Sequence, residues 1–410
     1  MLSSSPRHLS VLTVLIGIFW CAGEARAQGA GFASLAELQP GQLVRLDART
    51  LDQLGAKAKF TRQNRVAPDA HASLRSENTS IKSVPHFMGK FDSGGQTFQY
   101  SMVGRRPSSG QPVTVRNSIL PIRLLLPFPD ASGNQIVLDA STKVANTVAS
   151  PVYQRAPFAS GNTQFGDAMQ RATFWNQLSP RRDWHVWLDQ PEVRPTLDVF
   201  VPPESVLAFA RPDGSAVALV STAFFDAVLT LVFQLGDFDA RELPIILTYN
   251  TLLFDGDPSL CCALGFHSAF SKGARGRADA VQTFMFASWI DSGVFTSPAV
   301  ADVHSLSHEI AEWLNDPFVD NLVPSYVNGE TGCAPVLETG DQLVGFSLPV
   351  TLNGFLYHPQ TQSVLPYFTR ESPSTAQNGT YRFPEDPAVP NVFSTACSLP
   401  TSPAPPGVVP

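Results

Sequence analysis

The most constraining feature of the chain is an amphipathic segment, Asp302–Pro317, with the sequence DVHSLSHEIAEWLNDP. Asp302 can cap a helix at its start and Pro317 discourages its continuation, so the segment predicts a helix of about four turns. At about 100° per residue its apolar side chains fall within one sector. They are Val303, Leu306, Ile310, Trp313 and Leu314. We therefore expect this face of the helix to pack into a core.

The opposite face of the same helix carries His304, His308 and Glu312. His308 and Glu312 are four residues apart, so both side chains can reach one point in space. HExxH helices hold zinc by this geometry, and here the second position is glutamate, which gives HExxE. We predict His308 and Glu312 as metal ligands. Glu309 then has the place of a general base, which accepts a proton from a water that the ion has made more acidic.

A third ligand must come from elsewhere in the chain. The best candidates are Glu338 and Asp341, in the acidic turn ETGD that follows Cys333. His304, one turn before His308, is a further candidate. A carboxylate pair makes a harder ligand set than two imidazoles, so we expect one divalent ion, with zinc favoured only modestly over manganese or calcium.

Each of these residues also has a structural interpretation. The helix can be an ordinary amphipathic helix whose polar face is solvated, and His304 taken singly is more often a surface residue. His267, in CCALGFHSAF, is a candidate for orienting a substrate or stabilising a transition state, and it can equally be a structural histidine. The sequence leaves these alternatives open.

A second apolar segment, Ala216–Leu235, raises the question of a membrane span. Asp226 lies in its middle, and the segment divides into a strand, 216–220, and a helix that opens at Ser221 or Thr222 and closes at Gly236. The β-branched run Leu243–Tyr249 then predicts a buried strand. Strand, helix and strand together predict a βαβ unit, and no integral membrane span in the mature chain.

The first 27 residues have the pattern of a secretory signal peptide. Arg7 precedes the apolar run Leu9–Gly23, and Ala25-Arg26-Ala27 offers small residues for cleavage before Gln28. We therefore expect a secreted protein. Secretion also makes the four remaining cysteines informative, because an even number in an oxidising compartment predicts two disulfides. We expect Cys261 and Cys262 each to pair with one of Cys333 and Cys397, although free buried thiols are the alternative.

Composition and charge predict how the rest of the chain is divided into segments and argue against nucleic acid as a partner. The net charge of −7 disfavours nucleic acid as a partner, and 43% apolar residues predict a sizeable core. We expect a leader or linker at 28–83, a β-rich module at 84–150, an α/β metal-site domain at 151–398 and a disordered proline-rich tail at 399–410.

The chain contains SHEIAEWLNDPF and, further along, GCAPVLETGD. In these two motifs it resembles a group of secreted microbial proteins that have an SHEIAEaxxDP helix and a later GCxxxxExGD turn. The resemblance continues upstream through GNTQFGDAMQRATFW, LPIILTYN and CCALGFHSAF, and covers most of residues 84–345. That group has no established activity. A more local resemblance, to the active-site helix of zincin metallopeptidases, implies an α+β fold with a zincin-like mixed sheet, although Glu312 departs from their second histidine.

Three functions from different classes follow. The first is a secreted metal-dependent hydrolase, peptidase-like, that acts on a peptide or cell-surface polymer. The second is a non-catalytic binding protein of the cell surface or matrix with a structural or vestigial metal site. The third is a metal-independent glycosidase that uses paired carboxylates such as Glu309 and Glu338.

Overall fold

A computed structural model describes residues 43–44 and 66–385, except 76–79, 131, 179–182, 212–214, 257–260, 275–276, 296 and 329–331. The predicted signal peptide, most of the predicted leader and the predicted proline-rich tail lie outside these residues. The chain is an α+β protein with several sheets, which confirms the predicted class.

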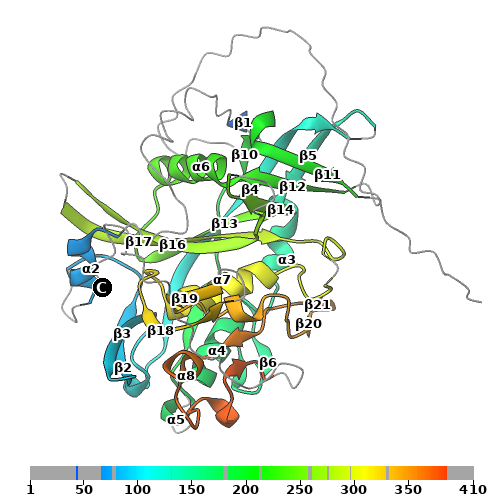
Figure 1. The fold of residues 1–410 in the computed structure, drawn as a ribbon. Coiled ribbons are helices and arrows are strands. Elements are labelled where there is room, and N and C mark those ends of the chain that lie inside the picture. Colours follow the sequence, from blue (N-terminus) through cyan, green and yellow to red (C-terminus); the bar gives the residue numbers. More distant parts are fainter. Residues whose placement is uncertain are drawn as a thin grey trace, which may run out of the picture.

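The largest sheet has nine strands and forms the centre of the molecule (Figure 1). Its main path runs β1-β10-β4-β13-β17-β16, and β5, β8 and β9 also pair with β4. Neighbours are parallel from β1 to β17, whereas the edge strand β16 is antiparallel to β17. The strands are β1 (Leu43–Val44), β4 (Val113–Pro129), β5 (Gln135–Asp139), β8 (Val186–Leu188), β9 (Glu192–Val193), β10 (Leu197–Phe200), β13 (Glu242–Tyr249), β16 (Gly265–Ala274) and β17 (Arg277–Trp289).

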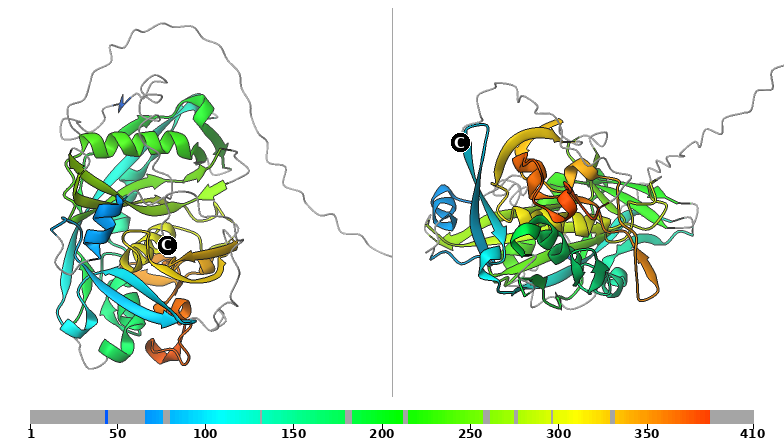
Figure 2. Two further views of the ribbon diagram at one scale, coloured as in Figure 1. Left: turned by 60° about the vertical axis from the view of Figure 1, so that its left-hand side comes forward. Right: turned by 90° about the horizontal axis from the view of Figure 1, so that it is seen from below.

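Two helices cover opposite faces of this sheet. Helix α6 (Thr222–Leu235) lies on one side of β13, β16 and β17, and α7 (His304–Asn315) lies on the other, as Figure 1 and the left-hand view of Figure 2 show. Alternation along β17 explains the two layers, because successive side chains of a strand point to opposite faces. Phe284 and Phe286 join the buried cluster of α6, whereas Met285 and Ala287 join that of α7.

The other elements surround this three-layer core. A four-stranded sheet contains β11 (Val206–Ala210), β12 (Ala216–Ser221), β14 (Thr251–Phe254) and β15 (Cys261–Ala263). Five two-stranded pairs are β2 (His86–Ser93) with β3 (Gln96–Val103), β6 (Ala156–Phe158) with β7 (Gly161–Thr163), β18 (Leu322–Asn328) with β19 (Gly332–Val336), β20 (Val350–Leu352) with β21 (Phe355–Tyr357), and β22 (Gln362–Ser363) with β23 (Arg382–Phe383). The remaining α-helices are α2 (Pro68–Leu74), α3 (Val144–Val148), α4 (Phe165–Thr173), α5 (Trp175–Leu178) and α8 (Leu365–Thr369). Single turns of 3-10 helix are η2 (Pro107–Ser109), η3 (Ala140–Lys143), η4 (Pro203–Ser205), η5 (Asp341–Leu343) and η6 (Gln377–Gly379).

The predicted strand, helix and strand at 216–249 are confirmed as β12, α6 and β13, but the predicted βαβ unit is wrong. β12 pairs with β11 and β14, while β13 lies between β4 and β17 in the larger sheet. A strand that is buried on both faces, as β13 is, needs a neighbour on each side. β4 and β17 supply these neighbours, so consecutive strands go to different sheets.

Pairing of β4 with β13 also joins the predicted β-rich module to the predicted metal-site domain in one sheet. The boundary at residue 150 stays a prediction. Among the residues that the structure describes, no helix combines the length and the apolar character that a bilayer crossing needs.

Candidate metal centre

Helix α7 packs as its sequence predicts. All five residues of the apolar stripe are buried in the cluster between α7 and the large sheet. The predicted cap is wrong, because Val303 occupies the N-cap position and makes no side-chain cap bond. Asp302 has a φ of 45°, and its carboxylate accepts hydrogen bonds from the backbone nitrogens of Val303 and His358, at 2.6 and 2.9 Å, and from Nδ1 of His358 at 2.6 Å. It therefore anchors the chain around His358 to the start of the helix.

The predicted pair His308 and Glu312 does converge. Nε2 of His308 lies 3.0 Å from Oε2 of Glu312. Asp341, at the start of η5, places Oδ1 3.5 Å from the same nitrogen, and Oε1 of Glu309 lies 3.8 Å from it. Two atoms that bind one ion at about 2.1 Å, with 90° to 120° between the bonds, lie about 3.0 to 3.6 Å apart. The spacings of His308 to Glu312 and to Asp341 fall in this range.

A ring of hydrogen bonds holds His308 and Glu312 in place. Nδ1 of His308 lies 2.9 Å from Oε1 of Gln360, an amide oxygen that can only accept, so we assign a proton to Nδ1, which leaves Nε2 to face the carboxylates. The amide nitrogen of Gln360 donates to the carbonyl of Gly340 at 2.7 Å. The backbone nitrogen of Gly340 in turn donates to Oε1 of Glu312 at 2.9 Å. Both candidate ligands are thus oriented through Gly340 and Gln360, as outer partners orient metal ligands.

Close approach explains why residue 340 is glycine. A Cβ atom on Gly340 would lie 2.4 Å from Nδ1 of His308, which is closer than real Cβ contacts. Gly265, at the start of β16, has the same relation to the candidate base, since its Cβ would lie 2.7 Å from Oε1 of Glu309. The backbone of the edge strand therefore lies directly against Glu309.

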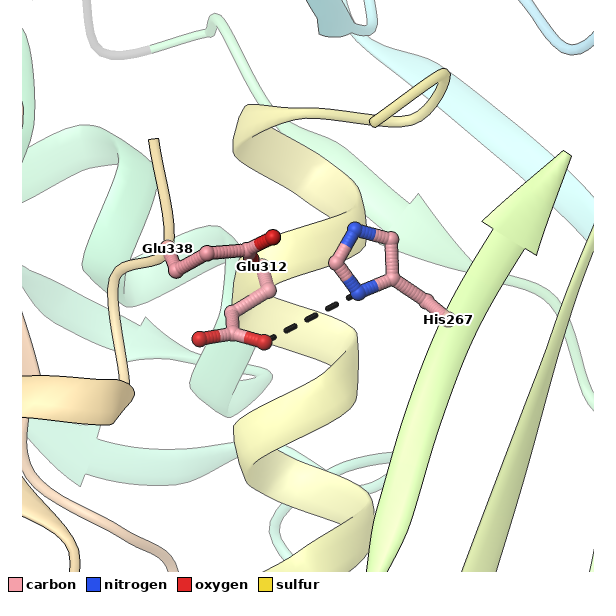
Figure 3. Close-up of side chains that lie close together, drawn as sticks. All are labelled: His267, Glu312 and Glu338. Carbon is pink, nitrogen blue, oxygen red and sulfur yellow. Dashed lines mark ion pairs between the residues drawn. The ribbon is translucent and has the colours of Figure 1, made fainter. Parts of the chain in front are cut away.

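His267 approaches the site from β16, opposite α7 (Figure 3). Its Nδ1 lies 3.4 Å from Oε2 of Glu309 and 3.7 Å from Oε2 of Glu312. Its Nε2 donates a hydrogen bond to the carbonyl oxygen of Asp316, 3.1 Å away. Burial by itself lowers the pKa of His267, but the hydrogen bond to Glu309 and the charge of Glu312 outweigh it and raise that pKa above its usual value.

Glu338 completes the acidic side of the site. Figure 3 shows its carboxylate beside that of Glu312, and potential ligand atoms of His267, Glu312 and Glu338 all lie within 4.8 Å of one another. Those of His308, Glu309 and Glu312 form a second such group, so Glu312 belongs to both. Oε2 of Glu338 has no hydrogen-bond partner among the described residues.

The pKa directions show how strongly these charges interact. Burial raises the pKa of Glu338 well above its ordinary value, and the charges of Glu312 and Asp341 add to the rise. Burial also raises the pKa of Glu312, against the opposing charge of His308. For His308, burial lowers the pKa, but the charges of Glu312 and Glu309 outweigh it and hold that pKa well above 6.5. Carboxylates gathered in this way repel one another unless protons or a cation balance them.

His304 and the polar face of α7 are not solvated, so the predicted surface histidine is wrong. His304 is 2% exposed, and Glu309 and Glu312 are each 3% exposed. Burial lowers the pKa of His304 to about 3, which keeps the ring neutral. His304 belongs to neither group of potential ligand atoms in the described part of the chain. The reason for its burial is that the segment with His358 and Gln360 covers the first turns of α7.

A small pocket leads to these residues. Its volume is about 130 Å³, room for a few water molecules or one short side chain. One wall is polar and contains the residues of α7 with His267, Glu338, Asp341 and Gln360. The apolar residues of its lining are Ala263, Leu264, Phe266, Val319 and Val344, and of these Phe266 packs in the cluster of α6 on the other face of the sheet. Cys262 lies at its rim and, like Cys333, is disulfide-bonded. The predicted pairing of Cys261 and Cys262 with one each of Cys333 and Cys397 stays a prediction, since the side chains of Cys261 and Cys397 lie outside the described residues.

The structure thus brings together every site residue predicted from the sequence except His304, which lies in the pocket wall. Sequence reasoning missed Gln360, which lies in no quoted motif, and it gave no role to Gly265 and Gly340, which lie inside the quoted CCALGFHSAF and ETGD segments. Comparison of the whole chain with family models, with curated proteins and with solved structures gives no match.

Proposed function

We propose that this protein is a secreted metal-dependent hydrolase of the peptidase-like kind. The observation that carries the proposal is the position of Nε2 of His308, which faces carboxylate oxygens of Glu312 and Asp341 at ligand-to-ligand spacings, with a proton placed on the other ring nitrogen. His308, Glu312 and Asp341 are the proposed ligands of one divalent ion. Of the two acidic candidates for the third position, Asp341 is favoured because its carboxylate approaches the same nitrogen.

In this proposal the chain's own residues divide the chemical work. When bound, a divalent ion supplies Lewis acidity and makes a water near its ligands acidic enough to lose a proton near neutral pH. Glu309 accepts that proton, because its carboxylate lies 3.8 Å from Nε2 of His308 and is buried against Gly265. His267 holds the Glu309 carboxylate in place from the other side, and can later donate a proton toward the leaving group.

Burial and donor type bear on the identity of the ion. The ligand set is one imidazole with two carboxylates, so zinc is favoured only modestly over manganese or calcium. Burial holds the proton on Glu338, and a divalent ion bound beside Glu312 favours its loss more strongly than a monovalent ion does.

The other functions find less support. A metal-independent glycosidase that uses Glu309 and Glu338 is less favoured, because ligand atoms of His308, Glu309 and Glu312 converge within 4.8 Å of one another, as they would around one ion. A non-catalytic binding protein is less favoured because a pocket reaches the candidate base. The mixed sheet above α7, with an antiparallel edge strand, supports the proposal of a zincin-like fold.

An assay that does not require the natural substrate to be known tests the proposal. Mature protein is incubated with a mixture of fluorogenic peptides, with a chelator, and with chelator followed by excess zinc, manganese or calcium. We expect cleavage that the chelator abolishes and one of the ions restores. Cleavage that persists in chelator would overturn the metal requirement, and cleavage of oligosaccharides in place of peptides would favour the glycosidase.

A further inference from the structure

Val319 stands in a backbone conformation that β-branched residues rarely adopt. Its φ is 54°, in the left-handed region that favours glycine and asparagine. Asp316 stabilises the turn that contains Val319. Its carboxylate oxygens accept hydrogen bonds from the backbone nitrogens of Asp320 and Asn321, each at 3.0 Å. The backbone nitrogen of Val319 also donates to the carbonyl of Asp316 at 3.2 Å. Strain of this kind persists only where the surrounding structure imposes it.

Core packing does not account for this valine. Val319 belongs to none of the buried apolar clusters that the described residues form, although its neighbour Phe318 does. Val319 is only partly buried and lines the pocket that leads to Glu309 and His267. The strained turn therefore places an isopropyl group in the pocket wall.

The same Asp316 connects this turn to the candidate catalytic residues. Its carbonyl oxygen accepts from Nε2 of His267, whose other nitrogen lies 3.4 Å from Glu309. The position of Val319 is consequently fixed relative to the reacting groups. Val344 lines the same pocket, so two valines contribute apolar surface beside the polar residues of α7.

We propose that Val319 is a specificity-determining residue, and that with Val344 it receives an aliphatic side chain of the substrate next to the bond that is cleaved. The inference rests on the proposed function and names the substrate class for that site. The pocket, of about 130 Å³, has room for a branched aliphatic side chain. The buried carboxylates beside it disfavour an acidic side chain.

Two variants separate the side chain from the strain. Val319→Asn keeps the approximate size and tolerates the left-handed conformation, but puts an amide in the wall. Val319→Gly removes both the side chain and the strain. We expect both variants to keep the metal content of the wild type and a melting temperature no lower than that of the wild type. We expect the ratio of kcat/KM for a leucine peptide to that for the matched glycine peptide to fall at least about tenfold.

Val193→Asn, on an exposed strand residue away from the pocket, is the matched control and leaves the ratio unchanged. Binding of N-acetyl-leucine amide and N-acetyl-glycine amide to the metal-free protein, followed by NMR, gives a second readout without activity. If the wild type prefers the leucine probe and Val319→Asn abolishes that preference, the inference is supported, whether or not any peptide is cleaved. A complete lack of peptide cleavage would overturn only the hydrolase proposal. Equal binding of the two probes by the wild type, or an unchanged ratio in the Val319 variants, would overturn the inference.

Discussion

Gln360 accepts a hydrogen bond from Nδ1 of His308 at 2.9 Å and, through its own amide nitrogen, bonds to the carbonyl of Gly340. This single amide therefore sets the tautomer of His308 and connects it to the backbone that holds Glu312. We expect Gln360→Leu, which removes the acceptor at similar size, to weaken metal binding by about 10- to 100-fold, as loss of such outer partners does.

Isothermal titration with zinc into chelator-treated protein measures this effect. Gln190→Leu, at an exposed position away from the pocket, serves as the control. An affinity for zinc that Gln360→Leu leaves unchanged would show that the hydrogen bond does not orient a ligand.

Gly340 and Gly265 approach different members of the site. Alanine at 340 places a methyl group against the imidazole of His308, whereas alanine at 265 places one against the carboxylate of Glu309. We expect Gly340→Ala to lose metal, and Gly265→Ala to keep metal but lose most of its hydrolytic rate. Metal content per protein and peptide cleavage, measured on the same samples, check this division. The account is wrong about the two roles if both variants lose metal equally.

Glu309→Gln separates proton transfer from metal binding. The amide keeps the size and polarity of the side chain but cannot accept a proton, so the rate of hydrolysis should fall by roughly 10² to 10⁴. The metal content should stay at the wild-type value, because Glu309 is not among the proposed ligands. Glu204→Gln, at an exposed position, is the matched control. Full activity of Glu309→Gln would exclude this residue as the base.

Stability of the metal-free protein should fall as the pH rises from about 5 to 8. Burial, with the charge of Asp320, raises the pKa of Asp316 to about 8, and burial also raises the pKa of Glu312 and of Glu338. A carboxyl group with a raised folded-state pKa holds its proton in the native protein and loses it in the unfolded chain. Its contribution is therefore complete below about pH 4 and is lost as the pH approaches the folded pKa.

Bound metal reverses this trend, because its ligands must be deprotonated and the stabilisation by metal grows with pH. Urea unfolding at pH 5 and pH 8, with chelator and with saturating zinc, tests both slopes. Asp316→Asn removes one titrating group and should flatten the slope of the chelated protein. A chelated protein that is more stable at pH 8 than at pH 5 would contradict the pKa directions.

Local periodicity explains what the sequence could predict. The apolar stripe of α7 and the convergence of His308 with Glu312 both follow from the helical repeat, which depends only on neighbouring residues. The placement of Gln360 depends on a segment 52 residues beyond His308 that covers the helix, and no local pattern encodes that contact.

Long-range packing also explains the wrong predictions. His304 has the spacing of a surface residue, but the same covering segment buries it. Strands β12 and β13 are individually clear in the sequence, yet their partners β14, β4 and β17 come from other parts of the chain. The residues of a strand do not determine which strands it pairs with. The two strands and the helix were therefore predicted correctly, whereas the βαβ unit that combines them was wrong.

Metal content of the purified mature protein tests the central claim most directly. Protein prepared without chelator, offered zinc, manganese or calcium and then desalted, is analysed by mass spectrometry of its metals beside His308→Ala, Glu312→Ala and Asp341→Ala. We predict about one equivalent of one ion in the wild type and its loss in all three variants, since two remaining ligands hold a divalent ion too weakly. Less than a tenth of an equivalent in the folded wild type would contradict the account and return the protein to the class of non-catalytic binding proteins.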